Sequence, residues 1–488
     1  MLDQLHTPPL KDTVSLLLRE ETPDSLTQLE LLLAHGDVAH EMVIGQLIYD
    51  WAHHEDDTSS RPLPPTDRPP PYIQYEGLRD GDQIGAPGIG RLSRNLNVAK
   101  EIFTALPHYG VRVADLGMPI SGPQEREKIL AMMKFINEQQ LPIFPAVASR
   151  THPDDVTAIA ELAGYAQKNF DIRPLVYAFL GSSRIRMLAQ GTNKWSLANL
   201  TRMVTTTVDA LKSNSSIGPV IVPFEDTYGS HPDDISILIN AAFESGADGI
   251  CICDTASRGQ DPAWTSNLIR YIGHTIAPLY PKKIWEIHTH NMMGKATENA
   301  LLAYEEGLIT GVHGTLGGVG DLGGNMPIDE FILEAHRRQL SLAKPEVMSS
   351  LDALVDTALN ARGISRDLNP FGNIYSPASR LVPSGIHAAA FRRMDEVGPH
   401  MKRILEHVYF PVAPSDLGLS IELGIVTPAS GATNVHALAR RLGYRDKLTD
   451  EHIAAVLTRA RQKGEPITDD EFQQVISEID KTIFVYRE

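Results

Sequence analysis

Two histidines one residue apart, His288 and His290, stand at the end of the apolar run IWEIHTH, where a strand would stop. In a strand, residues i and i+2 point to the same side, so both imidazoles would aim at one point. Two imidazoles can bind one metal ion, but a catalytic metal site usually has a third protein ligand. The pair therefore directs attention to other side chains that reach the same place.

The order of the elements predicts where that place is. Short β-rich runs alternate with amphipathic segments, and these runs cover residues 72–78, 111–117, 142–148, 174–181, 219–225, 249–255, 284–290 and 309–315. Strands that alternate with helices form a parallel sheet with right-handed crossovers. Eight such units within roughly 270 residues predict a closed (β/α)8 TIM barrel. A doubly wound open sheet is the alternative, but no glycine-rich dinucleotide turn follows the first run.

The rest of the chain divides around this barrel. Residues 1–60 carry apolar residues at helical spacing and predict an N-terminal helical extension, in which His53 and His54 are expected to be solvated. Residues 61–71 form a proline-rich linker, residues 72–340 the catalytic barrel, and residues 341–488 mainly helical C-terminal subdomains.

Composition restricts the class of protein. Of 488 residues, 42% are hydrophobic and 22% charged, as in a globular protein. The net charge of −17 argues against nucleic acid or an anionic membrane surface as a partner. No apolar run has the length of a membrane span, and no secretion signal is visible at the start. The only cysteines, Cys251 and Cys253, are too close along one strand to form an ordinary disulfide, so a cytoplasmic enzyme is expected.

In such barrels the chemistry lies at the C-terminal ends of the strands. The chain places polar or charged residues at each of these ends, namely Arg79, Asp80, Asp115, Arg150, Ser183, Arg186, Glu225, Thr255, His288, His290 and Asn325. A carboxylate from Asp80, two imidazoles from His288 and His290, and an amide oxygen from Asn325 would suit Zn²⁺, Mn²⁺, Co²⁺ or Mg²⁺ acting as a Lewis acid. The plainer interpretation is that the two histidines are polar residues at a strand end.

Three motifs, 78-LRDGDQ-83, His288-x-His290-Asn291 and GVGDLGGN at 318–325, resemble the DRE-TIM metallolyase superfamily. That group includes the isopropylmalate, homocitrate and citramalate synthases and 3-hydroxy-3-methylglutaryl-CoA lyase. The resemblance implies a metal-dependent Claisen condensation between an acyl-CoA, with acetyl-CoA as the expected co-substrate, and a 2-oxo acid. It implies that Arg79 stabilises the enolate or alkoxide oxygen and that Glu225 takes part in acid–base chemistry. The substrate-binding residues expected from the resemblance and the strand ends are Arg79, Gln83, Asp115, Arg150, Ser183, Arg186 and Thr255.

A weaker resemblance continues through SGIHAAAF at 384–391. In the synthases such a segment supplies a histidine from the neighbouring subunit, and His387 matches it, with Tyr409 as a less certain catalytic match. The resemblance therefore implies a homodimer in which each active site is completed by the neighbouring C-terminal subdomain.

The chain also departs from the family pattern. Leu322 stands where the synthases commonly carry an arginine, and Arg186 stands where many relatives have a histidine. Arg186 and Arg184 together could bind a second acidic group of the oxo acid, could bind CoA phosphates, or could be solvated. Two other functions stay open: a lyase that runs the reverse cleavage on the same metal, and a barrel subunit without catalysis.

Overall fold

The computed structural model describes residues 10–20, 23–64, 69–84, 89–190, 196–340, 342–343, 345–444 and 448–479. Positions 65–68 of the expected proline-rich linker, and position 341 at the expected start of the C-terminal subdomains, lie outside these residues. Within the described part of the chain, no helix is long and apolar enough to cross a membrane.

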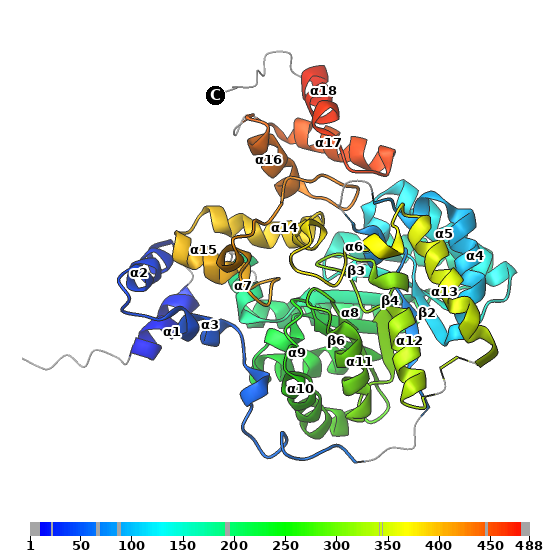
Figure 1. Cartoon of the computed structure of the whole chain (residues 1–488), viewed down its shortest axis with the longest axis horizontal. Coiled ribbons are helices and arrows are strands. Elements are labelled where there is room, and N and C mark those ends of the chain that lie inside the picture. Colours follow the sequence, from blue (N-terminus) through cyan, green and yellow to red (C-terminus); the bar gives the residue numbers. More distant parts are fainter. Residues whose placement is uncertain are drawn as a thin grey trace, which may run out of the picture.

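Eight parallel strands close into a barrel in which each strand pairs with the next and β8 pairs with β1 (Figure 1). The strands are β1 (Tyr72–Tyr75), β2 (Val111–Asp115), β3 (Phe144–Arg150), β4 (Leu175–Gly181), β5 (Val220–Glu225), β6 (Gly249–Asp254), β7 (Ile284–Thr289) and β8 (Gly311–Gly314). The predicted TIM barrel is confirmed, and the open sheet is wrong because β1 and β8 are joined in register from Tyr72↔Gly311 to Tyr75↔Gly314.

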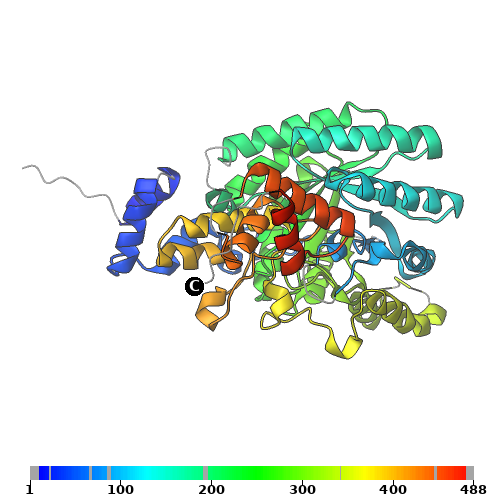
Figure 2. The same ribbon diagram turned by 90° about the horizontal axis from the view of Figure 1, so that it is seen from above.

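Helices follow the strands and surround the barrel, as seen from above in Figure 2. They are α4 (Leu96–Ala105), α5 (Pro123–Glu138), α6 (Pro153–Phe170), α7 (Arg184–Gln190), α8 (Leu197–Lys212), α9 (Pro232–Glu244), α10 (Pro262–Thr275), α11 (Ala296–Glu305) and α12 (Ile328–Arg337). Their starts are specified locally: α5, α6, α9 and α10 begin with proline, which needs no N–H partner there. The side chain of Asp261 also accepts a hydrogen bond from the first turn of α10.

Apolar packing occurs on both faces of the sheet. A large cluster fills the layer between strands and helices, and a small one, including Val113, Leu175, Ile221 and Cys251, fills the lower barrel interior. The strands pack closely enough that a Cβ atom on Gly249 would lie 2.7 Å from the Cβ atom of Ile284. The lower part of the barrel interior is therefore a packed scaffold.

The N-terminal extension is helical, as predicted, in α1 (Leu10–Glu20), α2 (Pro23–Ala34) and α3 (His40–Leu47). The third helix is shorter than the sequence pattern indicated, because the chain turns after Leu47 and buries Trp51 completely. His53 is solvated, but the expectation for His54 is wrong. Its buried ring lies 2.9 Å from the Asp56 carboxylate and 2.6 Å from the Tyr49 hydroxyl.

The C-terminal part is mainly helical, with α13 (Pro345–Asn360), α14 (Gly385–Phe391), α15 (Pro399–Glu406), α16 (Ala432–Arg441), α17 (Asp450–Lys463) and α18 (Asp469–Ile479). The last three helices share a hydrophobic cluster of their own and stand apart from the barrel at the top of Figure 1. Helices α14 and α15 pack with α7 and the N-terminal helices instead. The domain boundaries themselves stay a prediction.

Candidate functional site

The barrel mouth brings together three of the four predicted metal ligands. Asp80 begins a 3-10 turn shortly after β1, His288 lies in β7, and His290 follows β7 directly. Their ligand atoms all lie within 4.8 Å of one another, and all three side chains are buried. The predicted convergence of His288 and His290 on one point is confirmed, because their Nε2 atoms are 3.1 Å apart.

This spacing fits two ligands of one ion, since two metal–nitrogen bonds of about 2.1 Å at a right angle place the nitrogens about 3 Å apart. The outer nitrogens are already engaged. Nδ1 of His288 lies 2.9 Å from Oε2 of Glu76, and Nδ1 of His290 lies 3.0 Å from the backbone oxygen of Asp321. Such outer partners are those that orient metal-binding histidines and leave Nε2 free for the ion.

Two buried oxygen atoms at this point have no hydrogen-bond partner among the described residues. They are Oδ2 of Asp80 and Oδ1 of Asn325. Unpaired buried oxygens are costly, and a bound cation would satisfy both. Burial and the neighbouring His288 lower the pKa of His290 to about 4, so its imidazole is neutral, as metal binding requires. The residues present therefore fit a divalent metal, although the role of Asn325 as a ligand stays a prediction.

Glu76 organises this region. Its carboxylate accepts hydrogen bonds from Arg79 at 2.7 Å and from Asn325 at 3.3 Å, and it also contacts His288 and His313. Burial alone would raise the pKa of Glu76, but His288 and Arg79 hold it well below the ordinary value. The carboxylate therefore stays ionised inside the barrel.

His313 continues this network downward. Its ring lies between Glu76 and Glu286, 3.0 Å from the latter, and the hydroxyls of Tyr72 and Tyr177 donate to Glu286 as well. Burial alone would lower the pKa of His313, but Glu286 and Glu76 raise it to about 10. The protonated ring offsets two buried carboxylates beneath the metal ligands.

Arg79 is held by three carboxylates. Its guanidinium donates to Glu76, to Asp80 at 2.9 Å and to Asp115 at 2.9 Å. Asp115 is fully buried, and burial raises its pKa to about 6 despite the neighbouring Arg79. The structure thus places Asp115 behind Arg79, where it orients the guanidinium.

His387 reaches the mouth of its own barrel from α14. Its Nδ1 atom is 2.9 Å from Oδ2 of Asp321, and its Nε2 atom is 3.6 Å from Oε1 of Glu225. Its ring packs against that of Tyr409, with centroids 4.6 Å apart. Burial alone would lower the pKa of His387, but the hydrogen bonds with Asp321 and Glu225 raise it to about 9. Within one chain, His387 thus lies at the mouth of its own barrel, and its supply by a neighbouring subunit stays a prediction.

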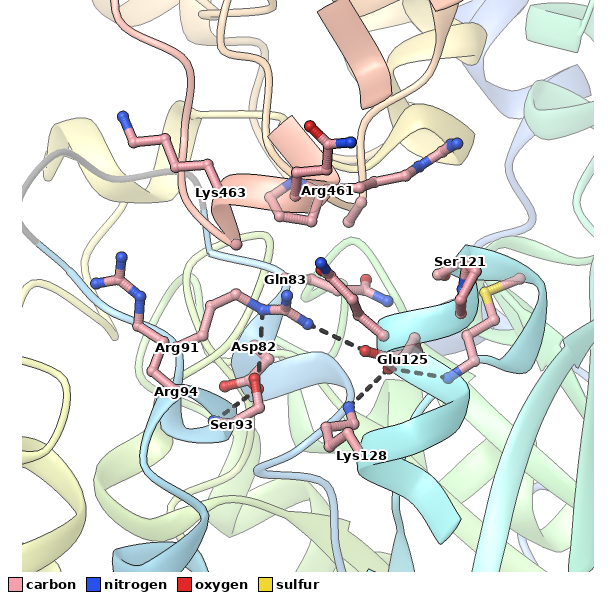
Figure 3. A pocket seen from close by; sticks show the side chains of 18 of the residues that line it. Asp82, Gln83, Arg91, Ser93, Arg94, Ser121, Glu125, Lys128, Arg461 and Lys463 are labelled. Carbon is pink, nitrogen blue, oxygen red and sulfur yellow. Dashed lines mark hydrogen bonds and ion pairs between the residues drawn. The ribbon is translucent and has the colours of Figure 1, made fainter. Parts of the chain in front are cut away.

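Two cavities meet at Arg79 and Gln83. The inner one, of about 60 Å³, is lined by the metal-ligand side chains together with Glu225, Thr255, Ser384 and His387. The outer one, of about 650 Å³, lies between the loops after β1 and β2 and helix α17. It is lined by several cationic side chains, which Figure 3 shows: Arg91, Arg94, Lys128, Arg461 and Lys463. Asp82 and Glu125 are the acidic residues in its lining.

The HMGL-like family model matches residues 71–363, which is more than half of the chain. The chain belongs to the HMGL-like family. The predicted membership of the DRE-TIM superfamily is thereby confirmed.

Individual relatives of this HMGL-like chain agree with the predicted enzyme class. The 2-isopropylmalate synthase of Heliobacterium modesticaldum is 26% identical over 411 residues, which cover 82% of this chain and 72% of that protein. Methylthioalkylmalate synthase 1-1 of Eutrema japonicum is 26% identical over 82% of this chain and 75% of its own length. Among solved structures, the HMG-CoA lyase of Bacillus subtilis is 18% identical, with a TM-score of 0.48 over 63% of this chain and 98% of that one.

The HMGL-like chain does not bring every predicted substrate-binding residue to the inner cavity. Arg150 forms an ion pair with Asp155 at 2.7 Å, and the Ser183 hydroxyl donates to Asp226 at 2.6 Å. Neither side chain lines the cavity, and neither does Arg186. Gln83 and Thr255 do line it, as predicted.

Arg186 has a different place in the HMGL-like chain. Its Nη2 atom donates to Glu225 at 2.9 Å, and its guanidinium lies 4.7 Å from the centroid of the Tyr409 ring. Burial alone would raise the pKa of Glu225, but Arg186 and His387 lower it to about 2. Arg184 instead pairs with Asp234 at 2.7 Å. The structure therefore does not bring the two arginines together.

Sequence reasoning missed Glu76, Glu286 and His313. All three are buried, and each is a titratable residue within a β-rich run: YIQYEGL, IWEIHTH and ITGVHGT. A charged residue inside a central strand of a parallel barrel has no access to bulk water, so it needs a charged partner. That signal could have directed attention to the barrel interior. Glu286 also lies two residues before His288, on the same side of β7.

Proposed function

We propose that the chain is a divalent-metal-dependent acyltransferase that condenses acetyl-CoA with a 2-oxo acid and releases free CoA. The main support for this proposal is the set of side chains that line the inner cavity. The side chains of Asp80, His288 and His290 line that cavity together with His387, whose Nδ1 is hydrogen-bonded to Asp321. Acid–base chemistry next to a carbonyl needs such a pairing of a cation site and a titratable group. The alkylmalate-type names of the relatives support the same reaction class.

Asp80, His288, His290 and Asn325 would hold the metal, which supplies Lewis acidity toward the carboxylate and ketone oxygens of a 2-oxo acid. The donor set of oxygen and imidazole nitrogen suits Zn²⁺, Mn²⁺, Co²⁺ or Mg²⁺.

His387 serves as the base in this proposal. Nε2 of its neutral form takes a proton from the acetyl-CoA methyl group, while Asp321 holds Nδ1 and stabilises the imidazolium that forms. The methyl carbon then bonds to the ketone carbon, and the ketone oxygen becomes an alkoxide. Arg79 donates toward that oxygen, since the three carboxylates around it fix its guanidinium in place. The alkoxide takes up a proton to give the hydroxyl of the product, and His387 gives up the proton that it took and returns to its neutral form. Water finally cleaves the thioester, which yields the carboxylate of the product and the free thiol of CoA.

The outer cavity is suited to the phosphate-bearing part of acetyl-CoA. Its cationic lining would bind phosphates in a protein whose overall charge is −17, and it shares Arg79 and Gln83 with the inner cavity. Arg461 and Lys463 come from α17, so the C-terminal helices contribute to this part of the site (Figure 3). The thioester end of the same molecule would then lie toward His387.

The test is release of free thiol, followed with a colorimetric reagent. Acetyl-CoA and Mg²⁺, Mn²⁺, Co²⁺ or Zn²⁺ are offered with pyruvate, 2-oxoisovalerate, phenylpyruvate, oxaloacetate or 2-oxoglutarate. We expect thiol to appear with at least one oxo acid, to require the metal, and to disappear in His290→Ala. His53→Ala, in a solvated histidine of the extension, is the matched control. If the protein instead cleaved a carbon–carbon bond of a 3-hydroxyacyl-CoA thioester and catalysed no condensation, that result would support the lyase alternative and refute the proposal.

A further inference from the structure

The segment that carries His387 and Tyr409 belongs neither to the barrel wall nor to the last three helices. Helices α14 and α15 pack in a hydrophobic cluster with α7 and the N-terminal helices. Buried residues of the extension, such as Leu29 and Val43, share that cluster with Met401 and Ile404 of α15 and with Tyr409 itself. In Figures 1 and 2, α2 lies beside α15 on the side away from the barrel, and α1 packs against α2. The extension therefore supports the segment that carries the proposed base His387 and its ring neighbour Tyr409.

One carboxylate of the extension makes the most specific contact. Glu30 of α2 accepts a hydrogen bond from the backbone N–H of His400 at 3.1 Å and another from that of Met401 at 2.8 Å. These two N–H groups belong to the first turn of α15. The N-cap residue of this helix, Gly398, has no side chain that could accept a hydrogen bond from them. Glu30 thus does for α15 what an N-cap aspartate does for other helices, and its charge also suits the positive end of the helix.

Gly398 explains how Glu30 comes so close. A Cβ atom at position 398 would lie 2.3 Å from the carboxyl carbon of Glu30. The backbone of Gly398 is extended, with φ −71° and ψ 171°, so the conformation itself does not require glycine. The glycine is needed only because Glu30 occupies the space.

The other end of α15 is tied to the barrel. The backbone oxygen of His407 accepts a hydrogen bond from Arg258 at 2.7 Å, and Arg258 pairs with Asp226, the residue after β5. The extension is tied to the same loop, because the backbone oxygens of Gly229 and Ser230 accept hydrogen bonds from Tyr49 and Trp51. Helix α15 is thus held at its start by the extension and at its end by the barrel.

We propose that residues 10–20 and 23–54 are an intramolecular clamp that positions His387 and Tyr409 over the mouth of the same barrel, with Glu30 as its positioning residue. This inference rests on the proposed catalytic role of His387. The proposed metal ligands lie on the barrel, and the outer nitrogens of both histidines are held by Glu76 and the backbone oxygen of Asp321, which lie outside the clamp. Loosening the clamp should therefore displace the base without displacing the ion.

The experiment uses the full chain with Glu30→Ala, and Glu41→Ala, in an exposed carboxylate of α3, as the matched control. Loss of a helix cap should lower kcat roughly tenfold and speed amide hydrogen exchange at residues 385–391 by a similar factor. Metal content and the KM for the oxo acid should not change. The second variant, Glu30→Ala with Gly398→Asp, gives α15 a cap of its own in the space that Glu30 vacates. It should restore both kcat and protection from exchange.

Three results would overturn the clamp: unchanged exchange at residues 385–391 in Glu30→Ala, parallel loss of metal and activity, or failure of the double variant to restore kcat after it restores stability. The exchange measurement needs no activity. If the wild type released no thiol, slower exchange in the wild type than in Glu30→Ala would still support the clamp, while the proposed reaction would be refuted. The two hypotheses can therefore fail separately.

Discussion

Glu76→Gln is the most informative single change at the metal site. The substitution keeps the volume of the side chain but removes its charge, and it places an amide NH₂ group among donors. Glu76 is fully buried and lies 2.9 Å from Nδ1 of His288, 2.7 Å from Arg79 and 3.2 Å from His313. His288 would lose the partner that fixes its tautomer and ring orientation. The guanidinium of Arg79 and the protonated ring of His313 would each lose a counter-charge.

Two magnitudes follow from these contacts. Removal of an outer partner of a metal-binding histidine weakens metal affinity by roughly 10- to 100-fold. Removal of one member of a buried charge network lowers the free energy of unfolding by about 3 kcal/mol. The remaining carboxylates, Asp80 and Asp115 around Arg79 and Glu286 beside His313, reduce the second cost but do not replace the contact with His288.

The assay is competition for Zn²⁺ against a chromophoric chelator, at a temperature well below the unfolding transition of the variant. Glu298→Gln, in an exposed carboxylate paired with Lys295 on α11, is the matched control and should bind metal as the wild type does. A Glu76→Gln protein that keeps wild-type metal affinity would refute the view that Glu76 orients His288. Loss of affinity in the control as well would point to a general charge effect.

Four further outcomes are expected. Because Asp321 and Glu225 raise the pKa of His387 to about 9, kcat should rise with pH through about 9. Asp321→Asn should shift this rise in the pH profile of kcat to lower pH and reduce the maximal kcat. An unshifted rise would exclude His387 as the titrating base. The same raised pKa stabilises the fold below about pH 6.5, and this contribution should be lost as pH rises through about 9, measurable as urea unfolding midpoints. Mixing His290→Ala with His387→Ala should restore no activity if each chain completes its own site, whereas exchange of segments between subunits would restore roughly a quarter. Arg461→Ala should raise the KM for acetyl-CoA with little change in kcat, and it should leave the KM for acetyl-pantetheine, which lacks the nucleotide phosphates, unchanged.

The fold could be predicted, and so could the convergence of the proposed metal ligands, because the signals for both are local. Each strand is a short apolar run, each following helix is amphipathic, and the barrel places all strand ends at one mouth. His288 and His290 needed only the two-residue period of a strand to be assigned to one point. Asp80 followed from its place after the first strand. Site residues of this kind depend on the backbone alone.

The rest depended on contacts between distant parts of the chain. Arg186 looked like a substrate ligand because it follows β4, but its guanidinium turns toward Glu225 and the Tyr409 ring, which lies more than 200 residues further along the chain. Glu76, Glu286 and His313 interact across the barrel interior, and their partners are 27 to 237 residues apart in the chain. Single-sequence patterns carry no information on such pairings.

The local contacts of the barrel and the contacts between distant parts of the chain should also respond differently to heat and denaturant. The metal ligands are held by groups of the barrel itself, Glu76 and the backbone of Asp321, within a sheet whose strands are buried on both faces. His387 sits on the seven-residue helix α14, outside the barrel wall, and the start of α15 in the same hydrophobic cluster is held by two hydrogen bonds to Glu30. Local opening has a lower free energy where fewer buried contacts hold an element. Heating or mild denaturant should therefore release His387 before the metal, so that activity is lost while the ion remains bound. Activity and metal content measured on the same samples over a urea series would separate these steps, and their coincident loss would show that the clamp and the barrel unfold as one unit.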